Sequence, residues 1–463
     1  MVTFGFLPFP PVIDQTINRV PLGPWSMMGF LAVITASGYL AYRRSPLVLG
    51  ALAFAIPFAA YRDVGNTTIT LEKCLVFGIT AGLLVSGMPL WPRSVGARRI
   101  LMASGLLLLT IILSLAHARY HVPALREFFK AAEFIILFWC AVAFLEHVQG
   151  SDRALCIGVS AGVFLAATLG VLQALVGGAP SGVWVNGHPL PRVAGPLEGP
   201  NQLAGFLEAA MPLLWVAPSL VSWMRAGART TTGIAAAALM LTQSRAGVLM
   251  AAVSYLFFRK IAPREGRLAQ WPMLSGGLFG FALAGAWYVW GAHASWGDAS
   301  RLFHLMDPQG AGGVGSRAQL WPAAIHLFQR SPLTGVGAGN FELLLPSVGV
   351  HGVQTNAGSL WLQTLAEQGL LGVVALIVFA VVGLRESFAA RTRSLLACAA
   401  FFAFASLLMH QLVDDLFFFP KVAALVWLML AGVAAGIVPD EEQASPGVRA
   451  ADAETQLAMP EHA

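Results

Sequence analysis

Residues 100–116 read ILMASGLLLLTIILSLA, and residues 369–384 read GLLGVVALIVFAVVGL, without a charged side chain in either stretch. A helix that crosses a bilayer needs about 20 mostly apolar residues, because every backbone N–H and C=O must find its partner inside the segment. With a few flanking residues, both stretches meet that requirement. They predict transmembrane α-helices.

The rest of the chain has the same character. Of its 463 residues, 57% are hydrophobic and 11% are charged, whereas a soluble domain carries roughly 25% charged residues. So few charges cannot cover a soluble surface. We predict an all-α, polytopic integral membrane protein with about 12 or 13 spans, near residues 25–42, 46–61, 71–91, 100–116, 131–147, 154–176, 201–222, 230–242, 246–258, 273–291, 369–384, 394–412 and 420–438. Segments 230–242 and 246–258 are short, so they are full spans or tilted or broken helices that meet at Gln243-Ser244-Arg245.

Basic residues fall on alternate loops between these spans, which is the pattern of cytoplasmic loops under the positive-inside rule. The net charge of +5 therefore reports topology, and no nucleic-acid partner is expected. The other loops, namely 62–70, 117–130, 177–200, the turn at Gln243, the long stretch 292–368 and 413–419, are expected outside the cytoplasm. The basic clusters are Arg43-Arg44, Arg93 with Arg98-Arg99, Arg225 with Arg229, Arg259-Lys260 with Arg264 and Arg267, and Arg385 with Arg391 and Arg393.

Three parts are expected along the chain: an N-terminal segment 1–24, a transmembrane domain 25–438 with a long periplasmic loop 292–368, and a disordered cytoplasmic tail 439–463. The start lacks the charged region, apolar run and cleavage site of a secretory signal peptide. The tail is acidic and rich in Ala, Pro and Gln. The four cysteines lie within predicted spans and indicate neither a disulfide framework nor a metal site.

Ionisable and polar residues near membrane depth are costly and therefore mark candidate sites. The first such segment, Pro191 to Asn201, is a Gly/Pro-rich loop that contains Arg192 and leads into a span. Asn201 there fits a helix N-cap, and a helix start attracts anions. An ordinary structured loop explains the same pattern.

The second segment is Thr242 to Gly247, where Ser244 and Arg245 stand between two apolar stretches. A guanidinium at the membrane face suits a phosphate, because its planar fork of donors matches phosphate oxygens and stays charged. A purely structural arginine is the alternative.

Two further polar segments lie in the predicted long loop. One contains Ser316-Arg317 and then the glycine-rich stretch Pro332 to Phe341, which lacks the Lys-Ser/Thr ending of a nucleotide-binding loop and is better read as a tight turn. The other, His351 to Gly372, contains Asn356 and Glu367. Beyond it, His410 with Asp414-Asp415 forms a polar cluster or simply caps a helix.

The order of these segments resembles the O-antigen ligase and O-antigen polymerase superfamily, which includes pilin-type O-oligosaccharyltransferases. The likeness runs from about Arg192 to Asp415. The resemblance implies a metal-independent, cofactor-free glycosyltransferase of the bacterial inner membrane, which moves a glycan from undecaprenyl diphosphate to a hydroxyl acceptor in the periplasm. That acceptor is lipid A core, a glycan or a protein. Lipopolysaccharide or surface polysaccharide biosynthesis is the implied setting.

On this resemblance Arg245 and Arg317 are expected catalytic residues, and Arg192, Asn201, Ser244, Ser316, Asn356 and Glu367 are expected to bind substrate. The resembled family usually carries a histidine, assigned as the base for the acceptor hydroxyl, at the position that is Gly358 here. His351 is the nearest substitute and lies on the same face if that stretch is helical.

Three other functions stay open. The chain could be an exopolysaccharide polymerase or an inactive relative; it could be a transporter or flippase for lipid-linked sugars; or it could be a non-catalytic scaffold. Transporters place binding residues at the bilayer midplane, whereas Glu133, Glu208 and Asp414 are expected near span ends, which favours an enzyme. In an enzyme Arg192, Arg245 and Arg317 would converge, whereas in a scaffold they would be scattered.

Overall fold

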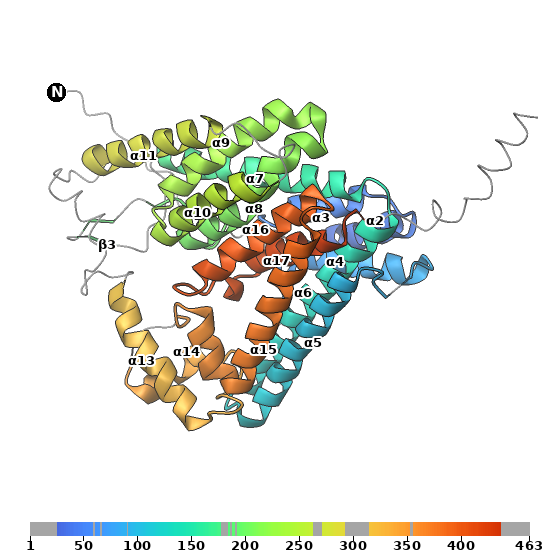
Figure 1. The fold of residues 1–463 in the computed structure, drawn as a ribbon. Coiled ribbons are helices and arrows are strands. Elements are labelled where there is room, and N and C mark those ends of the chain that lie inside the picture. Colours follow the sequence, from blue (N-terminus) through green and yellow to red (C-terminus); the bar gives the residue numbers. More distant parts are fainter. Residues whose placement is uncertain are drawn as a thin grey trace, which may run out of the picture.

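The computed structural model describes residues 26–58, 61–64, 67–89, 91–176, 184–185, 188–189, 192–262, 271–291, 314–351 and 355–436. The predicted N-terminal segment and cytoplasmic tail, and the part of the long loop before residue 314, lie outside these ranges. The described chain is almost entirely helical, which confirms the all-α class (Figure 1).

Every predicted span corresponds to a helix. The α-helices are α2 (Ser26–Tyr42), α3 (Leu47–Ala55), α4 (Leu71–Val85), α5 (Val95–Ser114), α6 (His121–His147), α7 (Ser151–Val176), α8 (Pro200–Leu220), α9 (Arg225–Leu241), α10 (Arg245–Ile261), α11 (Trp271–Gly291), α13 (Val314–Arg330), α14 (Phe341–Leu344), α15 (Leu360–Ala390), α16 (Leu395–His410) and α17 (Pro420–Leu430). Short 3-10 turns are η1 (Leu115–His117), η2 (Ser222–Met224), η5 (Leu345–Val348), η6 (Leu416–Phe418) and η7 (Ala431–Ala434).

Two small antiparallel hairpins interrupt the helices: β1 (Tyr61–Val64) with β2 (Thr67–Thr70), and β3 (Trp184–Val185) with β4 (His188–Pro189). Both lie in segments that the sequence predicted as loops.

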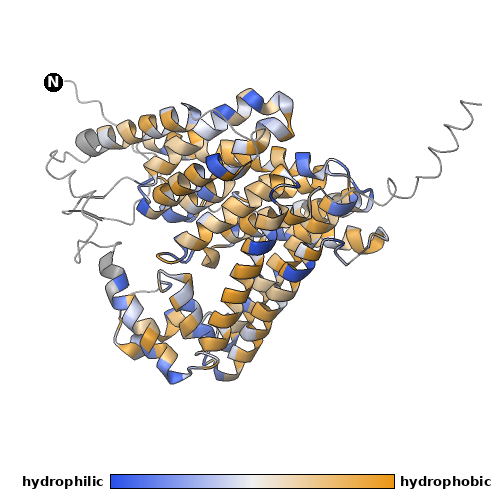
Figure 2. Cartoon of the chain, in the orientation of Figure 1, coloured by the Kyte–Doolittle hydropathy of each residue, from blue (hydrophilic) through white to orange (hydrophobic). Residues whose placement is uncertain are grey.

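Among the described residues, five helices are long and apolar enough to cross a membrane: α5 with η1, α6, α7, α8 and α15. Figure 2 shows hydrophobic residues along most of the helices and hydrophilic ones mainly at their ends and turns. The structure thus confirms a multi-pass membrane protein. Helix α3 has only nine residues, which extends about 14 Å at 1.5 Å per residue and does not span a bilayer alone. The predicted stretch 46–61 was therefore too long.

Two predicted helix starts were wrong. Helix α6 begins at His121, so most of the predicted loop 117–130 is helical. Its first turns carry Arg126, Glu127 and Lys130, whose charges hid the helix from a hydropathy argument, and Lys130 pairs with Glu127 three residues earlier. Helix α15 begins at Leu360, inside the predicted long loop, and its backbone leaves the helical conformation at Gly369.

The glycine-rich stretch after α13 is a tight turn, as the sequence predicted. It packs against the break in α15. Backbone N–H groups of Val336 and Gly337 donate to the carbonyls of Ala366 and Glu367, each at 3.0 Å. Gly369 has φ +65°, and a Cβ there would lie 2.5 Å from the Leu333 carbonyl. Only glycine permits both the conformation and this approach. The turn therefore fixes α13 and α14 to the first part of α15.

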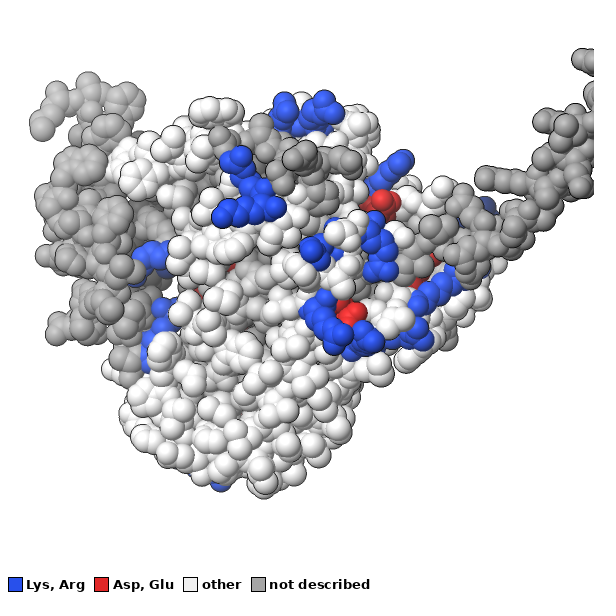
Figure 3. Space-filling model, in the orientation of Figure 1, with Lys and Arg blue, Asp and Glu red and all other residues white. Residues whose placement is uncertain are grey.

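Helix α15 packs antiparallel along α5, and α8 packs against α16 (Figure 1). Arg99 pairs with Glu386 at 2.8 Å at one end of the α5–α15 pair, and Thr110 donates to Gln368 at 2.9 Å toward the other. At the Arg99 end, Arg44 donates to the Ser86 carbonyl and Arg393 to that of Val433. Figure 3 shows Lys and Arg gathered in patches at the centre right and upper parts of this face, while its broad lower part carries almost none.

Candidate functional site

A hydrogen-bonded chain joins the first polar segment to the loop between α16 and α17. Arg192 donates from Nε to the Thr242 carbonyl at 2.7 Å and from a terminal nitrogen to Asn201 Oδ1 at 2.7 Å. Asn201 Nδ2 donates in turn to Asp414 Oδ2 at 2.8 Å. Helix α8 begins at Pro200 with Gly199 as its N-cap, since proline suits the first helical position. The predicted N-cap role of Asn201 was therefore wrong, and its amide bridges Arg192 and Asp414 instead.

Arg192 is largely removed from solvent. Burial lowers the pKa of its guanidinium to about 10, opposed by Asp414 and reinforced by Arg245. At neutral pH Arg192 stays charged. Its hydrogen bond to the Thr242 carbonyl places this cation beside the turn before α10.

That turn presents Ser244 and Arg245 at a helix start. Ser244 is the N-cap of α10, and its hydroxyl accepts a hydrogen bond from the Gly247 N–H at 3.4 Å. Arg245 is the first residue of the helix and is exposed. The positive end of the helix dipole and a guanidinium thus coincide at this point. Gln243, at φ +53°, makes the reversal between α9 and α10.

Arg317 approaches the same region from α13. Its Nε is buried and has no hydrogen-bond partner among the described residues. A Cβ at Gly358 would lie 3.3 Å from this Nε and 3.4 Å from Cγ, and Gly358 has φ +63°. A side chain at position 358 would therefore strain the backbone and press on Arg317. Glycine at position 358 is what lets Arg317 lie over this backbone.

Asn356 holds the segment around Gly358 in place. Its Oδ1 accepts from the Gly358 N–H at 3.0 Å, and its Nδ2 lies 3.5 Å from the Asp415 carbonyl oxygen. The Leu360 N–H donates to the carbonyls of Gln411 and Asp414, each at 3.1 Å. The start of α15 and residues 411–415 consequently form one hydrogen-bonded wall.

A buried acid and imidazole lie behind this wall. His410 Nδ1 lies 2.6 Å from Glu208 Oε2, and the two side chains are 1% and 0% exposed. A Cβ at Gly247 would lie 3.5 Å from His410 Cε1, so the imidazole sits directly beneath the first turn of α10. His410 also interacts electrostatically with Asp414 and Arg317.

The three predicted arginines therefore gather around residues 410–414 and are not scattered. Arg192 reaches Asp414 through Asn201, Arg245 interacts with Arg192, and Arg317 with His410. The sequence had already noted His410 and Asp414, but the partnership with Glu208 was missed. The spacing of Asn201 and Glu208, seven residues apart on one helix, places both on one face and could have indicated it.

The other predicted residues are placed differently. His351 is exposed, and the described residues between it and α15 are not helical. The shared face with Gly358 assumed for His351 was therefore wrong, and its role stays a prediction. Glu367 is buried and accepts hydrogen bonds from the Phe341 N–H at 3.0 Å and from Gln363 at 2.9 Å. Ser316 lies in α13 beside Arg317.

Two predicted positions of acids were also wrong. Glu208 is nine residues into α8 and Glu133 is thirteen residues into α6, which places Glu208 about 12 Å and Glu133 about 18 Å from their helix starts. Neither lies near a helix end: α6 begins ten residues before its predicted span, whereas α8 begins at Pro200, within one residue of the prediction. The argument against a transporter from the absence of mid-span acids does not hold.

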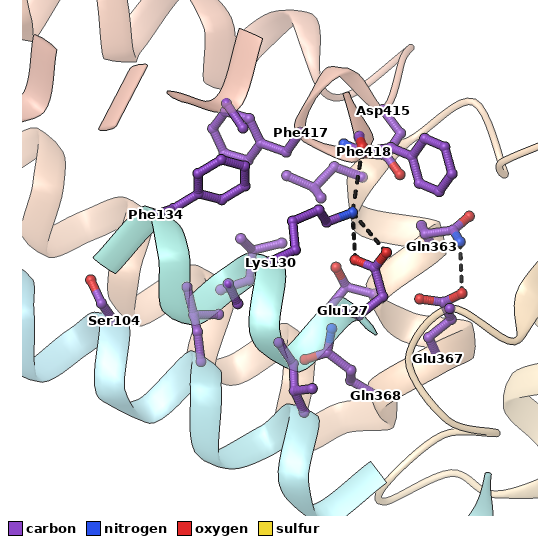
Figure 4. Close-up of a pocket in the computed structure, with 18 of the residues that line it drawn as sticks. Ser104, Glu127, Lys130, Phe134, Gln363, Glu367, Gln368, Asp415, Phe417 and Phe418 are labelled. Carbon is purple, nitrogen blue, oxygen red and sulfur yellow. Dashed lines mark hydrogen bonds and ion pairs between the residues drawn. The ribbon is translucent and has the colours of Figure 1, made fainter. Parts of the chain in front are cut away.

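A cavity of about 160 Å³ lies between α5, α6, α15 and α17 (Figure 4). Its ionisable lining residues are Glu127, Lys130, Glu367 and Asp415. Lys130 Nζ is bonded to Glu127 at 2.6 Å and to the Phe418 carbonyl at 3.4 Å, and it lies 4.9 Å from the centre of the Phe418 ring. Burial raises the pKa of the Asp415 carboxyl to about 7.

Together the fold and the site define a class: an all-α, multi-pass membrane protein with an arginine-rich site where several helix ends meet. Residues 230–377 match the family model described as O-Antigen ligase. This match confirms the predicted resemblance to the O-antigen ligase superfamily. It includes Arg245, Arg317 and Asn356, whereas Arg192, Glu208 and the 410–415 segment lie outside it. No curated protein matches the chain.

Proposed function

We propose that this protein transfers a glycan from a lipid diphosphate carrier, undecaprenyl diphosphate, to a hydroxyl acceptor at the periplasmic face of the bacterial inner membrane. The observation that carries the proposal is the placement of Arg192, Arg245 and Arg317 around residues 410–414. The domain match supports the reaction class. The same match supports the proposed setting in lipopolysaccharide or surface polysaccharide biosynthesis.

The chemistry that these arginines serve is loss of a diphosphate. The acceptor oxygen attacks the anomeric carbon, the bond from that carbon to the diphosphate oxygen breaks, and the leaving group gains negative charge. Fixed guanidinium groups stabilise that charge more in the transition state than in the ground state. Arg245, at the N-terminus of α10, and Arg317 would contact the diphosphate, while Asn201 links Arg192 to Asp414 beside them.

The acceptor proton needs a base, and we retain His351 as the proposed one. General-base assistance is worth roughly 10²- to 10⁴-fold, so His351→Ala is expected to lower turnover by about that factor while leaving donor binding intact. Steady-state transfer rates at saturating donor measure it. His326→Ala, an exposed histidine on α13, is the matched control. Wild-type turnover in His351→Ala would assign proton removal to His410, Asp414 or the carrier diphosphate.

Sidedness is a separate proposal, in which residues 292–368 face the periplasm and the tail after Pro439 faces the cytoplasm. It rests on the basic loops, whose residues Arg44, Arg99 and Arg393 lie at the same ends of the packed helices. Alkaline phosphatase fusions at residue 310 should be active, and fusions at residue 440 inactive. A cytoplasmic signal from the fusion at 310 would place every proposed site residue on the wrong side.

The acceptor distinguishes the remaining versions of this function. Lipid A core would make the protein a ligase, a growing glycan would make it a polymerase, and a protein would make it an O-oligosaccharyltransferase. Purified protein incubated with an undecaprenyl-diphosphate-linked glycan and each acceptor in turn tests them. Movement of the carrier across the bilayer without glycan transfer would instead identify a flippase.

A further inference from the structure

Helix α13 has a buried side that joins it to the rest of the protein. This side consists of Leu320, Ala323, Ala324 and Leu327, which are at most 5% exposed and belong to the smaller hydrophobic cluster of the structure. Their spacing of i, i+3, i+4 and i+7 is that of one face of an α-helix. They pack α13 against α14 and the first part of α15. The remaining surface of α13 faces outward.

The outward surface of α13 is divided lengthwise into two unlike flanks. The apolar flank, at i, i+4 and i+7, consists of Trp321, Ile325 and Phe328. The polar flank, at i, i+7 and i+11, consists of Gln319, His326 and Arg330. Trp321 and Ile325 are each 38% exposed, and all three residues of the polar flank are exposed. With 3.6 residues per turn, the two flanks lie on either side of the buried side. A helix surrounded by water would not require such a division, whereas one at a boundary between lipid and water would.

The turn after α13 lies beside the lipid-facing surface of α15. The N–H groups of Leu370 and Leu371 donate to the carbonyls of Pro332 and Leu333 at 2.8 and 3.1 Å. Leu370 and Leu371 are 47% and 41% exposed on a helix that is long and apolar enough to cross a membrane, so these side chains face lipid. Leu333, beside them, is 64% exposed. Apolar surface therefore continues from α15 onto the turn that follows α13. In the lower part of Figure 1, where these segments lie, Figure 3 shows almost no charged side chains on this face.

We propose that α13 is an interfacial helix, which lies along the membrane surface next to the arginine site with its apolar flank in lipid and its polar flank in water. The partner is the lipid leaflet itself. Tryptophan is enriched at this level of a membrane, and helices of this kind bury their apolar side about 5–10 Å into the boundary between headgroups and acyl chains.

The interfacial position has a consequence for Arg317. Arg317 precedes Trp321 by four residues, so the two lie one turn apart on the same side of α13. A helix anchored through its apolar flank therefore holds Arg317 at the level of the lipid phosphates. That consequence rests on the proposed function, in which Arg317 meets a lipid diphosphate, whereas the contact of α13 with lipid does not.

The depth of spin labels on two neighbouring residues tests the proposal without any substrate. Ile325→Cys and His326→Cys, one on each flank and both exposed, are labelled separately with a nitroxide in the full-length protein. The protein is placed in liposomes of phosphatidylcholine and phosphatidylglycerol. Power-saturation electron paramagnetic resonance then compares collisions of the nitroxide with oxygen, which concentrates in the bilayer, and with a water-soluble nickel chelate. The label at 325 should lie about 5–10 Å inside the bilayer, and the label at 326 in water. Wild-type protein, whose four cysteines are buried, gives the background.

Two labels that both collide mainly with the nickel chelate would place α13 in water and overturn the proposal. A label at 325 that is protected from both reagents would overturn it as well, because protein, such as a second copy of the chain, would then cover the apolar flank. If either variant does not fold, Trp321→Cys and Gln319→Cys give the same comparison earlier in the helix. Because no glycan transfer is measured, a failure of the proposed function and a failure of this inference are separate results.

Discussion

Arg317→Ala and Arg245→Ala are each expected to lower glycan transfer by at least about 10²- to 10³-fold, the usual loss when one donor to a developing anion is removed. Arg317 offers a buried Nε with no partner among the described residues, and Arg245 stands exposed at the first residue of α10. Lysine at either position should restore only part of the activity, because an ammonium supplies charge without the bidentate fork. The measurement is the initial rate of transfer by purified protein.

The control for this pair is Arg330→Ala. Arg330 lies on the same helix as Arg317 and donates hydrogen bonds to Ser347 Oγ and to the Ser347 carbonyl, each at 2.8 Å. Its loss should affect the packing of the turn after α14 and leave the transfer rate near that of the wild type. Full transfer by both Arg317→Ala and Arg245→Ala, with normal expression, would remove the diphosphate role from these residues.

The second large effect is on stability. Glu208 and His410 join α8 to α16 through one 2.6 Å contact between side chains that are almost fully buried. Removing one partner leaves the other polar group buried without its mate, which typically costs about 3–5 kcal/mol, whereas replacing both by apolar residues is often neutral. Glu208→Leu and His410→Leu should therefore each lower the thermal unfolding midpoint strongly, and the double variant should recover most of the loss.

A double-mutant cycle on the detergent-purified protein measures this coupling. Additive losses in the double variant would show that the two side chains do not stabilise one another. The cycle also clarifies transfer assays, since a stable double variant that lacks activity would give His410 or Glu208 a role beyond packing.

Hydropathy was sufficient for the class of fold, because a spanning helix must be apolar over its own length. Every predicted span has a helix in the structure. The wrong boundaries share a cause. The early turns of α6 and α15 carry polar residues such as Lys130 and Glu367, and the partners of these residues offset the cost of burying them. Those partners are visible only after folding.

The same distinction between local sequence and distant partners applies to the candidate site. Ser244 and Arg245 could be placed at a helix start from local sequence, and the structure has them there. Pairs distant in the chain could not be found, since His410 and Glu208 are 202 residues apart and Asn201 and Asp414 are 213 apart. The sequence could not explain the glycine at position 358, where the resemblance implies a histidine; its role is visible only in the structure, where Arg317 lies against it.

The arginines around residues 410–414 are proposed to serve transfer of a glycan from a lipid diphosphate. The most direct measurement supplies purified protein with a radiolabelled glycan on undecaprenyl diphosphate and a glycolipid acceptor, and follows both label in the acceptor and release of undecaprenyl diphosphate. We predict that the two appear in equal amounts and that both fall by at least about 10²-fold in Arg317→Ala. Label that remains on the carrier with every acceptor offered, in wild-type protein that is folded and monodisperse, would rule out this role for the arginines.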